Sequence, residues 1–360
     1  MNFGSIIEEK LKNVFDKFNH QGQFDSFYEL ASGHINDTYF IKSRVKPNFI
    51  LQRINDKVFK DVPGMIKNKI KISHHIQKKL NHLNKDELKR RVLTFVYTKD
   101  GSTYFKDDYG CFWNMTIFIE DSKTFEIVEN EDIAYEAGKL FGDFLKHTDD
   151  FNVSDLVEAI PNFHKMSYRY SIFDEAISNS NKVRLEKSFP YINIVNELKN
   201  EMHILENMTN MGLFKLRVTH NDTKISNALF DNENKGLCVI DTDTVMPGIV
   251  LFDFGDAIRT ICNNATEDET NLDKVSFNFN YYYAYKNGFL ETLGNSLSET
   301  EINHLPLGVK TTIFIMALRF LTDYLLGDVY YKTGYPEHNL NRAKNQFKLI
   351  ESFTEKMKSI

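Results

Sequence analysis

The chain has 360 residues, with 42% hydrophobic and 26% charged side chains, which is the composition of an ordinary soluble globular protein with room for two cores. Its formal net charge is −6, with 44 Lys and Arg against 50 Asp and Glu. This balance, together with the lack of a dense basic run, excludes a general nucleic-acid binder.

The start of the chain, Met1-Asn-Phe-Gly-Ser-Ile-Ile-Glu-Glu-Lys, has no cationic region followed by an apolar core, so no signal peptide is expected. A helix is predicted over residues 6–18, followed by strands over residues 24–30, 37–42 and 48–54. The turn between the first two strands could lie over phosphates. Its single glycine is a weak phosphate-loop signal, and a purely structural turn is an equal interpretation. The candidate nucleotide-binding residues from this hairpin are Gly33, Asn36 and Thr38.

The strand at residues 48–54 carries Gln52 and Arg53, whereas a protein kinase has there a lysine that pairs with a helix glutamate. The next predicted helix, residues 63–83, contains no acidic residue, so this standard ion pair is absent. Strand alternation places the two side chains on opposite faces, so only one can point at a nucleotide. We choose Gln52, with Arg53 as a solvent or sheet-edge residue. The lysines of the helix are interpreted as a solvated face.

Strands over residues 92–97, 102–106 and 111–119 complete a small antiparallel sheet. Beyond it, helical periodicity dominates, with helices predicted over residues 132–147, 189–208, 268–286, 307–326 and 339–358. The longest apolar stretch, residues 311–326, is interrupted by two charges and is too short to cross a bilayer. We therefore expect a cytoplasmic protein with no membrane partner, and a monomer, because no strong oligomerisation signal is present.

The three cysteines, Cys111, Cys238 and Cys262, are far apart and odd in number. This pattern fits a reducing compartment and indicates neither a disulfide framework nor a zinc site. We expect all three to be buried thiols.

The most informative motif is His220-x-Asp222-x-Lys224-x-x-Asn227, which follows a strand-like run at residues 214–219. Phosphoryl transfer from Mg·ATP needs a carboxylate near the acceptor hydroxyl, positive charge on the phosphates and oxygen ligands for the metal. Asp222 is the candidate base, Lys224 could neutralise phosphate, and Asn227 offers a neutral oxygen to Mg²⁺. Polar residues around turns often only bond their own backbone, so this motif alone does not decide the function.

A second acidic motif follows a predicted hairpin turn at residues 231–236 and a buried strand ending at Ile240. Asp241 leaves this strand as the second candidate ligand of Mg²⁺. Asp243 lies on the same side if the segment is extended, and could bind a second metal, orient the first or hold the acceptor. The cofactors predicted from both motifs are ATP and Mg²⁺.

Arg319 interrupts the apolar helix Phe314-Ile-Met-Ala-Leu-Arg-Phe-Leu, where a guanidinium must find partners or face a cavity. It is a candidate substrate-binding residue, together with Tyr330. A structural ion pair with Asp323, one helical turn away, is the competing interpretation. Asp253 and Asp256 are expected to be scaffold carboxylates that bond the catalytic loop.

These motifs resemble the aminoglycoside phosphotransferase and choline kinase superfamily. The segments His220-Asn-Asp-Thr-Lys224, Val239-Ile-Asp-Thr-Asp-Thr-Val-Met-Pro-Gly248, Phe252-Asp-Phe-Gly-Asp-Ala-Ile-Arg259 and Ala317–Tyr330 more closely resemble its N-acetylhexosamine 1-kinase branch. The resemblance implies an α+β, protein-kinase-like two-lobed fold. It has a small antiparallel-sheet N-lobe over residues 1–119 and a larger, mostly helical C-lobe over residues 120–360.

The resemblance also implies that backbone groups near the end of the last strand hold adenine, with Ile117 and Ile119 as candidates. It implies that positions matching Arg319 and Tyr330 contact the sugar, which completes a substrate set with Asp222 and Asp243. The expected reaction is ATP-dependent phosphorylation of the anomeric hydroxyl of GlcNAc or GalNAc. Alternatives are another small acceptor, such as a neutral hexose, an amino alcohol or an aminoglycoside, and a pseudokinase that binds nucleotide without turnover.

Overall fold

The computed structural model describes residues 3–30 and 35–358. The chain folds into two compact units. The first contains Met1–Glu126, Leu140–Pro161 and Ser226–Pro247, and the second contains Ile127–Lys139, Asn162–Ile225 and Gly248–Ile360. The chain therefore passes between the units several times. The boundary after residue 119 stays a prediction.

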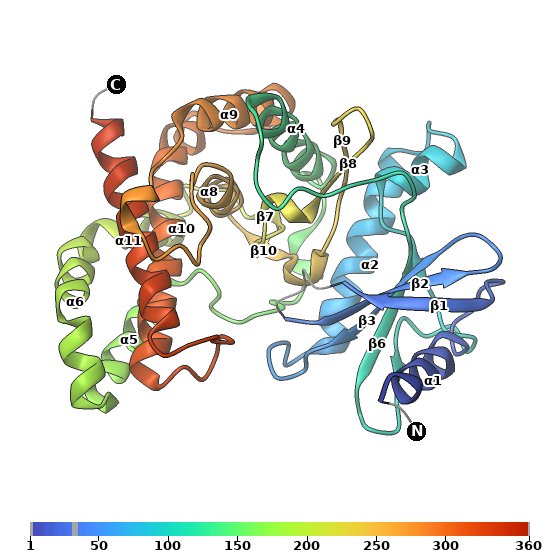
Figure 1. Ribbon diagram of the computed structural model, residues 1–360. Coiled ribbons are helices and arrows are strands. Elements are labelled where there is room, and N and C mark those ends of the chain that lie inside the picture. Colours follow the sequence, from blue (N-terminus) through green and yellow to red (C-terminus); the bar gives the residue numbers. More distant parts are fainter. Residues whose placement is uncertain (1–2, 31–34, 359–360) are drawn as a thin grey trace. The chain divides into compact units, whose positions relative to one another are not determined.

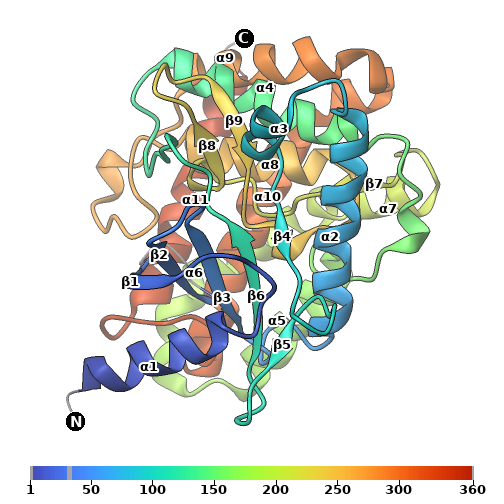
Figure 2. The same cartoon turned by 90° about the vertical axis from the view of Figure 1, so that its right-hand side faces the viewer.

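The first unit is built on a six-stranded sheet with the order β1-β2-β3-β6-β4, in which β5 also pairs with β6 (Figure 2). Every pairing in it is antiparallel, as the sequence predicts. The two predicted strands at residues 92–97 and 102–106 shorten to two residues each. The strands are β1 (Phe24–Glu29), β2 (Asp37–Ser43), β3 (Phe49–Ile54), β4 (Phe95–Val96), β5 (Phe105–Lys106) and β6 (Phe112–Ile117).

The two faces of this sheet have different partners. Helix α1 (Phe3–Phe15) packs Leu11 and Phe15 against Leu51, Trp113 and other residues that alternate on one face. Helix α2 (Val62–Lys79) lies on the opposite side of the sheet from α1 (Figure 1). Alternation along β3 means that the side chains next to Leu51 in sequence face α2 instead.

Helix α2 ends four residues before its predicted end, and a further helix, α3 (Lys85–Arg91), follows it. The Asn84 side chain accepts the backbone N–H groups of Asp86 and Glu87, which starts α3 as an ordinary N-cap. The prediction that the helix continues from Lys79 to residue 83 was therefore wrong. At the other end, the Asp61 side chain accepts from Gly64 N–H and starts α2.

A hairpin of β8 (Ala228–Phe230) and β9 (Gly236–Val239) belongs to the same unit. The Asp231 side chain accepts the N–H groups of Glu233 and Lys235, and Asn234 takes a positive φ of 63°. These contacts form the tight turn that the sequence predicts between the two strands.

The second unit is mostly helical. Helix α6 starts seven residues before the prediction, with Pro190 inside it, and α9 starts eleven residues after its predicted start, where the Asn278 side chain caps it. Helices α5 and α8 were not predicted. The helices of the chain beyond α3 are α4 (Glu131–His147), α5 (Met166–Asn179), α6 (Lys182–Met202), α7 (Ile204–Asn210), α8 (Val250–Ile261), α9 (Phe279–Leu293), α10 (Glu299–Leu326) and α11 (His338–Met357).

Helix α10 is the central helix of the second unit and packs against α8, α11 and α5 (Figure 1). A capping box of Ser298 and Glu301 starts it eight residues before the predicted start. With 28 residues and a mean hydropathy of 1.4 over its most apolar window, it is long and apolar enough to cross a membrane, contrary to the prediction from residues 311–326. However, 72% of that window is buried within the structure, as in a core helix.

Helices α8 and α10 meet through two glycines. A Cβ on Gly255 would lie 2.5 Å from the Gly308 carbonyl oxygen, and a Cβ on Gly308 would lie 2.6 Å from the Leu251 carbonyl oxygen. No side chain larger than hydrogen fits at either position without a shift of backbone. This contact fixes the position of α8, which carries Asp253 and Asp256.

The cysteines are free. Cys238 and Cys262 are buried as predicted, and burial raises the pKa of the Cys238 thiol to about 12 and the pKa of the Cys262 thiol well above its ordinary value. The prediction was wrong for Cys111, which is only half-buried because it lies in the turn before β6.

Candidate active site

Asn227 and Asp241 lie at the open end of the β8–β9 hairpin. Ala228 pairs with Val239, and the Ile240 N–H donates to the Asn227 carbonyl at 2.9 Å, so the two predicted metal residues leave adjacent strands side by side. No cluster of three or more His, Cys, Asp or Glu side chains suited to a metal occurs within residues 3–30 and 35–358. One amide and one carboxylate fit Mg²⁺, which keeps several waters and takes further oxygens from phosphates.

The segment after Asp241 turns instead of staying extended. Asp241 has left-handed backbone angles (φ 56°, ψ 53°), and a 3₁₀ turn, η3 (Thr242–Thr244), follows it. Asp243 was expected on the same side as Asp241 only if the segment were extended, and the segment is not extended. Asp243 is buried instead, and its carboxylate accepts from Asn36, Gln52 and Lys69.

The predicted nucleotide residues of the sheet share one face. Thr38 pairs with Gln52 on β3, and Gln52 pairs with Asn114 on β6, so the three side chains lie on the face opposite α1. The Asn114 amide donates to Gln52 Oε1 at 3.4 Å. Arg53 lies on the other face and pairs with Asp37, as its alternative interpretation expects.

Asn36 joins the same group, because its Nδ2 donates to Asp243 while its Oδ1 accepts the Asn55 N–H at 2.8 Å. Gly33 lies outside the residues that the structure describes.

The predicted adenine segment follows β6. The Ile117 N–H donates to the Thr94 carbonyl and the Phe118 N–H to the Asn48 carbonyl, each at 2.9 Å. Ile119 is buried against Leu237 and Cys238 of β9. Within the described part of the chain, no protein group accepts the Ile119 N–H, so the structure leaves this donor to a ligand or to solvent.

Lys69 is a site residue that the sequence prediction did not include. Its side chain is only 5% exposed, and its ammonium donates to Gln52 Oε1 at 3.2 Å and to Asp243 Oδ1. The interpretation of the α2 lysines as a solvated face is wrong at this position. A usable signal was present, since Lys69 falls at helical spacing between Met65 and Ile76 on the apolar stripe of α2.

In the second unit, the loop with the catalytic motif follows β7 (Arg217–Thr219) and is held by α8. Asp253 accepts the N–H of His220 at 2.8 Å and of Asn221 at 2.7 Å, and Asp256 accepts the Thr223 N–H at 2.9 Å. The prediction that these two carboxylates bond the catalytic loop is confirmed.

Asp222 and Lys224 lie on the same side of this loop. Lys224 Nζ is 3.3 Å from Asp222 Oδ2, and both side chains are partly exposed. Asn221, directly before Asp222, has a positive φ of 63°. The loop therefore presents one carboxylate and one ammonium next to each other, as the spacing of two residues predicts.

The charges beneath the loop are buried. Burial raises the pKa of Asp253 to about 6 and also raises the pKa of Asp256. Arg259 Nε donates to Asp256 at 3.0 Å, and its Nη1 donates to Glu267 at 2.7 Å. The loop thus rests on a chain of alternating charges on α8 and the segment after it.

Arg319 and Asp323 do not form the ion pair of the competing interpretation. Asp323 instead accepts the backbone N–H groups of Val329, Tyr330 and Tyr331 at 2.8–3.0 Å. This carboxylate folds the loop after α10 back onto the helix. The Arg319 guanidinium lies 5.6 Å from the Tyr330 ring centroid and 5.5 Å from that of Tyr331.

A second arginine lies close to Arg319. Arg169 donates to the Phe163 carbonyl, and the Phe163 ring centroid is 5.1 Å from the Arg319 guanidinium. Burial and the charge of Arg319 lower the pKa of Arg169 to about 10, and burial with both arginines lowers the pKa of His164 to about 3. Among the described residues, no carboxylate pairs with either arginine.

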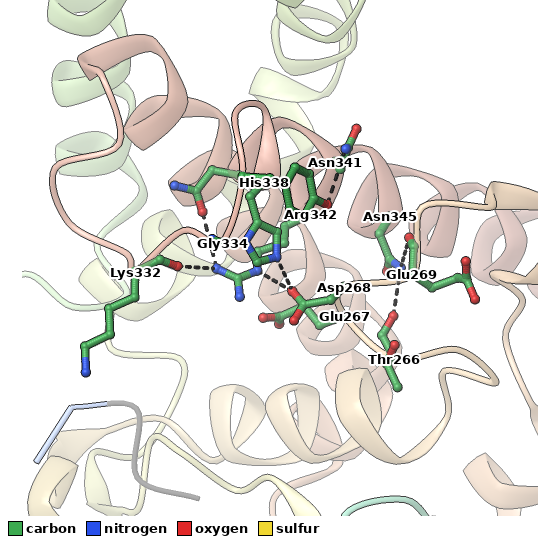
Figure 3. A network of polar contacts seen from close by, with 12 residues as sticks. Thr266, Glu267, Asp268, Glu269, Lys332, Gly334, His338, Asn341, Arg342 and Asn345 are labelled. Atoms are coloured by element: carbon green, nitrogen blue, oxygen red, sulfur yellow. Dashed lines mark hydrogen bonds and ion pairs between the residues drawn. The ribbon is translucent and has the colours of Figure 1, made fainter. Parts of the chain in front are cut away.

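A polar network holds Lys332 and Gly334, which follow Tyr330 in the same loop (Figure 3). Asp268 accepts from His338 Nε2 at 2.9 Å and from Arg342 Nε at 2.5 Å. The Gly334 N–H donates to His338 Nδ1, and Arg342 Nη1 donates to the Lys332 carbonyl. The loop is therefore anchored both to α10 and to α11.

Comparison with known proteins decides the family. A model described as "Phosphotransferase enzyme family" matches residues 27–275, which is more than half of the chain. The chain belongs to this family. The matched region of this phosphotransferase contains strands β2 to β6 and the motifs around Asp222 and Asp241.

Three solved structures are similar to this phosphotransferase over nearly the whole chain. An aminoglycoside phosphotransferase from Alicyclobacillus acidocaldarius has a TM-score of 0.64 at 11% identity, covering 97% of this chain and 96% of that one. A spectinomycin phosphotransferase in complex with ADP and spectinomycin has a TM-score of 0.59 at 12% identity, covering 98% of each chain. The choline kinase LicA from Streptococcus pneumoniae has a TM-score of 0.57 at 14% identity, covering 98% of this chain and 100% of that one.

These similarities confirm the predicted α+β, protein-kinase-like fold, with an antiparallel-sheet N-lobe and a mostly helical C-lobe. Family and fold together show that the protein is a phosphotransferase with a protein-kinase-like fold.

Proposed function

We propose that this kinase uses Mg·ATP to phosphorylate the anomeric hydroxyl of an N-acetylhexosamine, GlcNAc or GalNAc. Asp222 accepts the proton of the hydroxyl, and Lys224 neutralises charge on the transferred phosphoryl group. Asn227 and Asp241 would hold Mg²⁺, which would supply positive charge against the negative charge of the phosphates. The adjacent exits of Asn227 and Asp241 from the β8–β9 hairpin support this assignment.

Nucleotide binding is assigned to the first unit. We propose that Asn36, Thr38 and Gln52 support the phosphates together with Gly33, and that the backbone of Ile117 and Ile119 holds adenine. The Ile117 N–H is already bonded to Thr94, so only its carbonyl could contact the base. The Ile119 N–H is the better donor.

The choice of acceptor rests on one observation, the arginine pair of the second unit. Arg319 and Arg169 lie among Phe163, Tyr330 and Tyr331, without a carboxylate partner in the described chain. Such a cluster repels cationic acceptors such as choline or an aminoglycoside. It suits a neutral acceptor whose carbonyl and hydroxyl oxygens accept from guanidinium groups, with an aromatic ring against the sugar.

A panel of acceptors tests this proposal. The purified protein is incubated with Mg·ATP and GlcNAc, GalNAc, glucose, galactose, choline, aminopropanol or an aminoglycoside, and ADP release is measured. We expect turnover with the N-acetylhexosamines. Turnover only with the amino alcohols or aminoglycosides would show that the assignment of the arginine cluster is wrong. Action as a cytoplasmic monomer is part of the same proposal.

A further inference from the structure

We propose that Lys69 and Asp243 form the ion pair that positions the metal-binding segment of this kinase. It stands in place of the strand lysine and helix glutamate of protein kinases. Lys69 is then a positioning residue that acts on Asp241 through Asp243. The inference rests on the proposed function in one respect, the assignment of Mg²⁺ to Asp241.

The ammonium of Lys69 is fully engaged inside the first unit. It donates to Asp243 Oδ1 and to Gln52 Oε1, and it lies 5.7 Å from the centroid of the Phe95 ring. The Lys69 side chain is 5% exposed and that of Asp243 is 4% exposed. A lysine has three N–H donors and no acceptor, so two hydrogen bonds and an aromatic contact account for its polar surface.

The other oxygen of Asp243 is engaged as well. Asp243 Oδ2 accepts from Asn36 Nδ2 and from Gln52 Nε2, the latter at 3.3 Å. Both oxygens of this carboxylate therefore accept from the hairpin, the strand and the helix of its own unit. This occupancy favours a positioning role for Asp243 over direct ligation of a metal or the acceptor.

Helix α2 holds the segment after the metal residue at two points. Lys69 reaches Asp243, and the neighbouring Asn68, itself 2% exposed, donates to the Val245 carbonyl at 2.9 Å. Asp241, the proposed metal residue, precedes these contacts in the chain and has a left-handed backbone conformation. A non-glycine residue in that region is strained and persists where its surroundings impose it. The contacts from α2 supply that constraint.

The charges are redistributed relative to a protein kinase. The strand carries the neutral Gln52, the helix carries the cation, and the carboxylate comes from the segment that bears the metal ligand. The pair therefore connects α2 to the metal-binding segment, whereas the pair of a protein kinase connects a strand to a helix.

The test compares Lys69→Met, Asp243→Asn and the double variant Lys69→Met/Asp243→Asn. Removing one partner of a buried pair strongly destabilises a protein, whereas replacing both is often neutral, so the double variant is expected to recover thermal stability. Asp243→Asn is the second variant if the double variant does not fold, because its amide oxygen still accepts from Lys69. Lys67→Met, an exposed lysine on the same helix, is the matched control.

The readout is Mn²⁺ titration of the ADP complex, which does not depend on finding the acceptor. We expect metal affinity about 10-fold to 100-fold weaker in the double variant than in the wild type, as for loss of other residues that orient a ligand. Metal-free ADP affinity should be the same in the double variant and in Asp243→Asn, because both lack the carboxylate that accepts from Asn36 and Gln52. Wild-type metal affinity in a folded double variant would overturn the proposal. So would metal-free ADP binding that is weaker in the double variant than in Asp243→Asn, since Lys69 would then contact phosphate directly. Absence of turnover with every sugar in the wild type would contradict the proposed acceptor but leave this result standing.

Discussion

The carboxylate of Asp253 accepts the backbone N–H of His220 at 2.8 Å, so a buried charge on α8 fixes the start of the loop that carries Asp222. The same carboxylate accepts from Asn221, and Asp256 accepts from Thr223. Hydrogen bonds to an ionised acceptor are about twice as strong as neutral ones. The backbone on either side of the candidate base is therefore held by hydrogen bonds to two carboxylates of α8.

Replacing the candidate base should strongly reduce turnover without affecting nucleotide binding. Asp222→Asn keeps the size of the side chain but cannot accept a proton, so kcat should fall by about 10²-fold to 10⁴-fold. The affinity for ADP, measured by calorimetry, should stay at the wild-type value. Asp174→Asn, at an exposed position on α5, is the control. Wild-type kcat in Asp222→Asn would mean that another group removes the proton.

The raised pKa of Asp253 predicts a specific dependence of stability on pH. Burial raises this pKa to about 6, above its ordinary value of 3.8, so the folded state holds the proton more tightly than the unfolded chain. Stability should therefore fall as the pH rises from about 4 to about 6 and then level off, by about 3 kcal/mol for this group.

Urea unfolding of the wild type and of Asp253→Asn at pH 4 and pH 7 isolates this contribution. The wild type should lose stability relative to the variant between the two pH values, because the amide does not titrate. If the difference between them were the same at both pH values, Asp253 would not carry a raised pKa.

The glycine contact between α8 and α10 predicts a large effect of a small substitution. Gly255→Ala places a Cβ against the Gly308 carbonyl, so the helices must separate, and overpacking of this kind typically costs about 1–3 kcal/mol. The free energy of unfolding from urea denaturation measures it. Gly294→Ala is the matched control, because the nearest atom to its Cβ lies 3.9 Å away. Equal stability of the two variants would contradict the close contact.

Replacing Arg319 should weaken binding of the acceptor and leave binding of the nucleotide unchanged. Arg319→Met removes charged donors, each worth about 1.5–3 kcal/mol, so the KM for GlcNAc or GalNAc should rise about 10-fold to 100-fold. The KM for ATP should not change. Lys332→Met removes a positive charge from the same loop at an exposed position and should leave both values alone. A changed KM for ATP with an unchanged KM for the sugar would contradict the acceptor role.

The sequence predicts those parts of the site that depend on local spacing. The hairpin that brings Asn227 next to Asp241 follows from two short apolar strands and a polar turn, and the ion pair of Asp222 with Lys224 follows from a spacing of two residues. The face shared by Thr38 and Gln52 follows from strand alternation. Such patterns are imposed by the backbone and can be read without tertiary contacts.

Other features depend on contacts between distant segments, which no local pattern contains. Lys69 is a lysine on an amphipathic helix, and its burial depends on Asp243, 174 residues away, and on Gln52 of β3. Likewise, Asp323 accepts backbone N–H groups of the loop after α10 and does not pair with Arg319. The sequence does not show where those N–H groups lie. Helix α5 was not predicted, although its buried residues Met166, Tyr170, Phe173 and Ala176 follow helical spacing.

The identity of the product tests the central claim most directly. The protein is incubated with Mg·ATP and GlcNAc or GalNAc, and the phosphorylated sugar is examined by ³¹P and ¹H nuclear magnetic resonance. We predict a sugar 1-phosphate, whose phosphorus couples to the anomeric proton. A phosphate coupled to the protons at C6 or another carbon, or no sugar phosphate while an amino alcohol is phosphorylated under the same conditions, would contradict it.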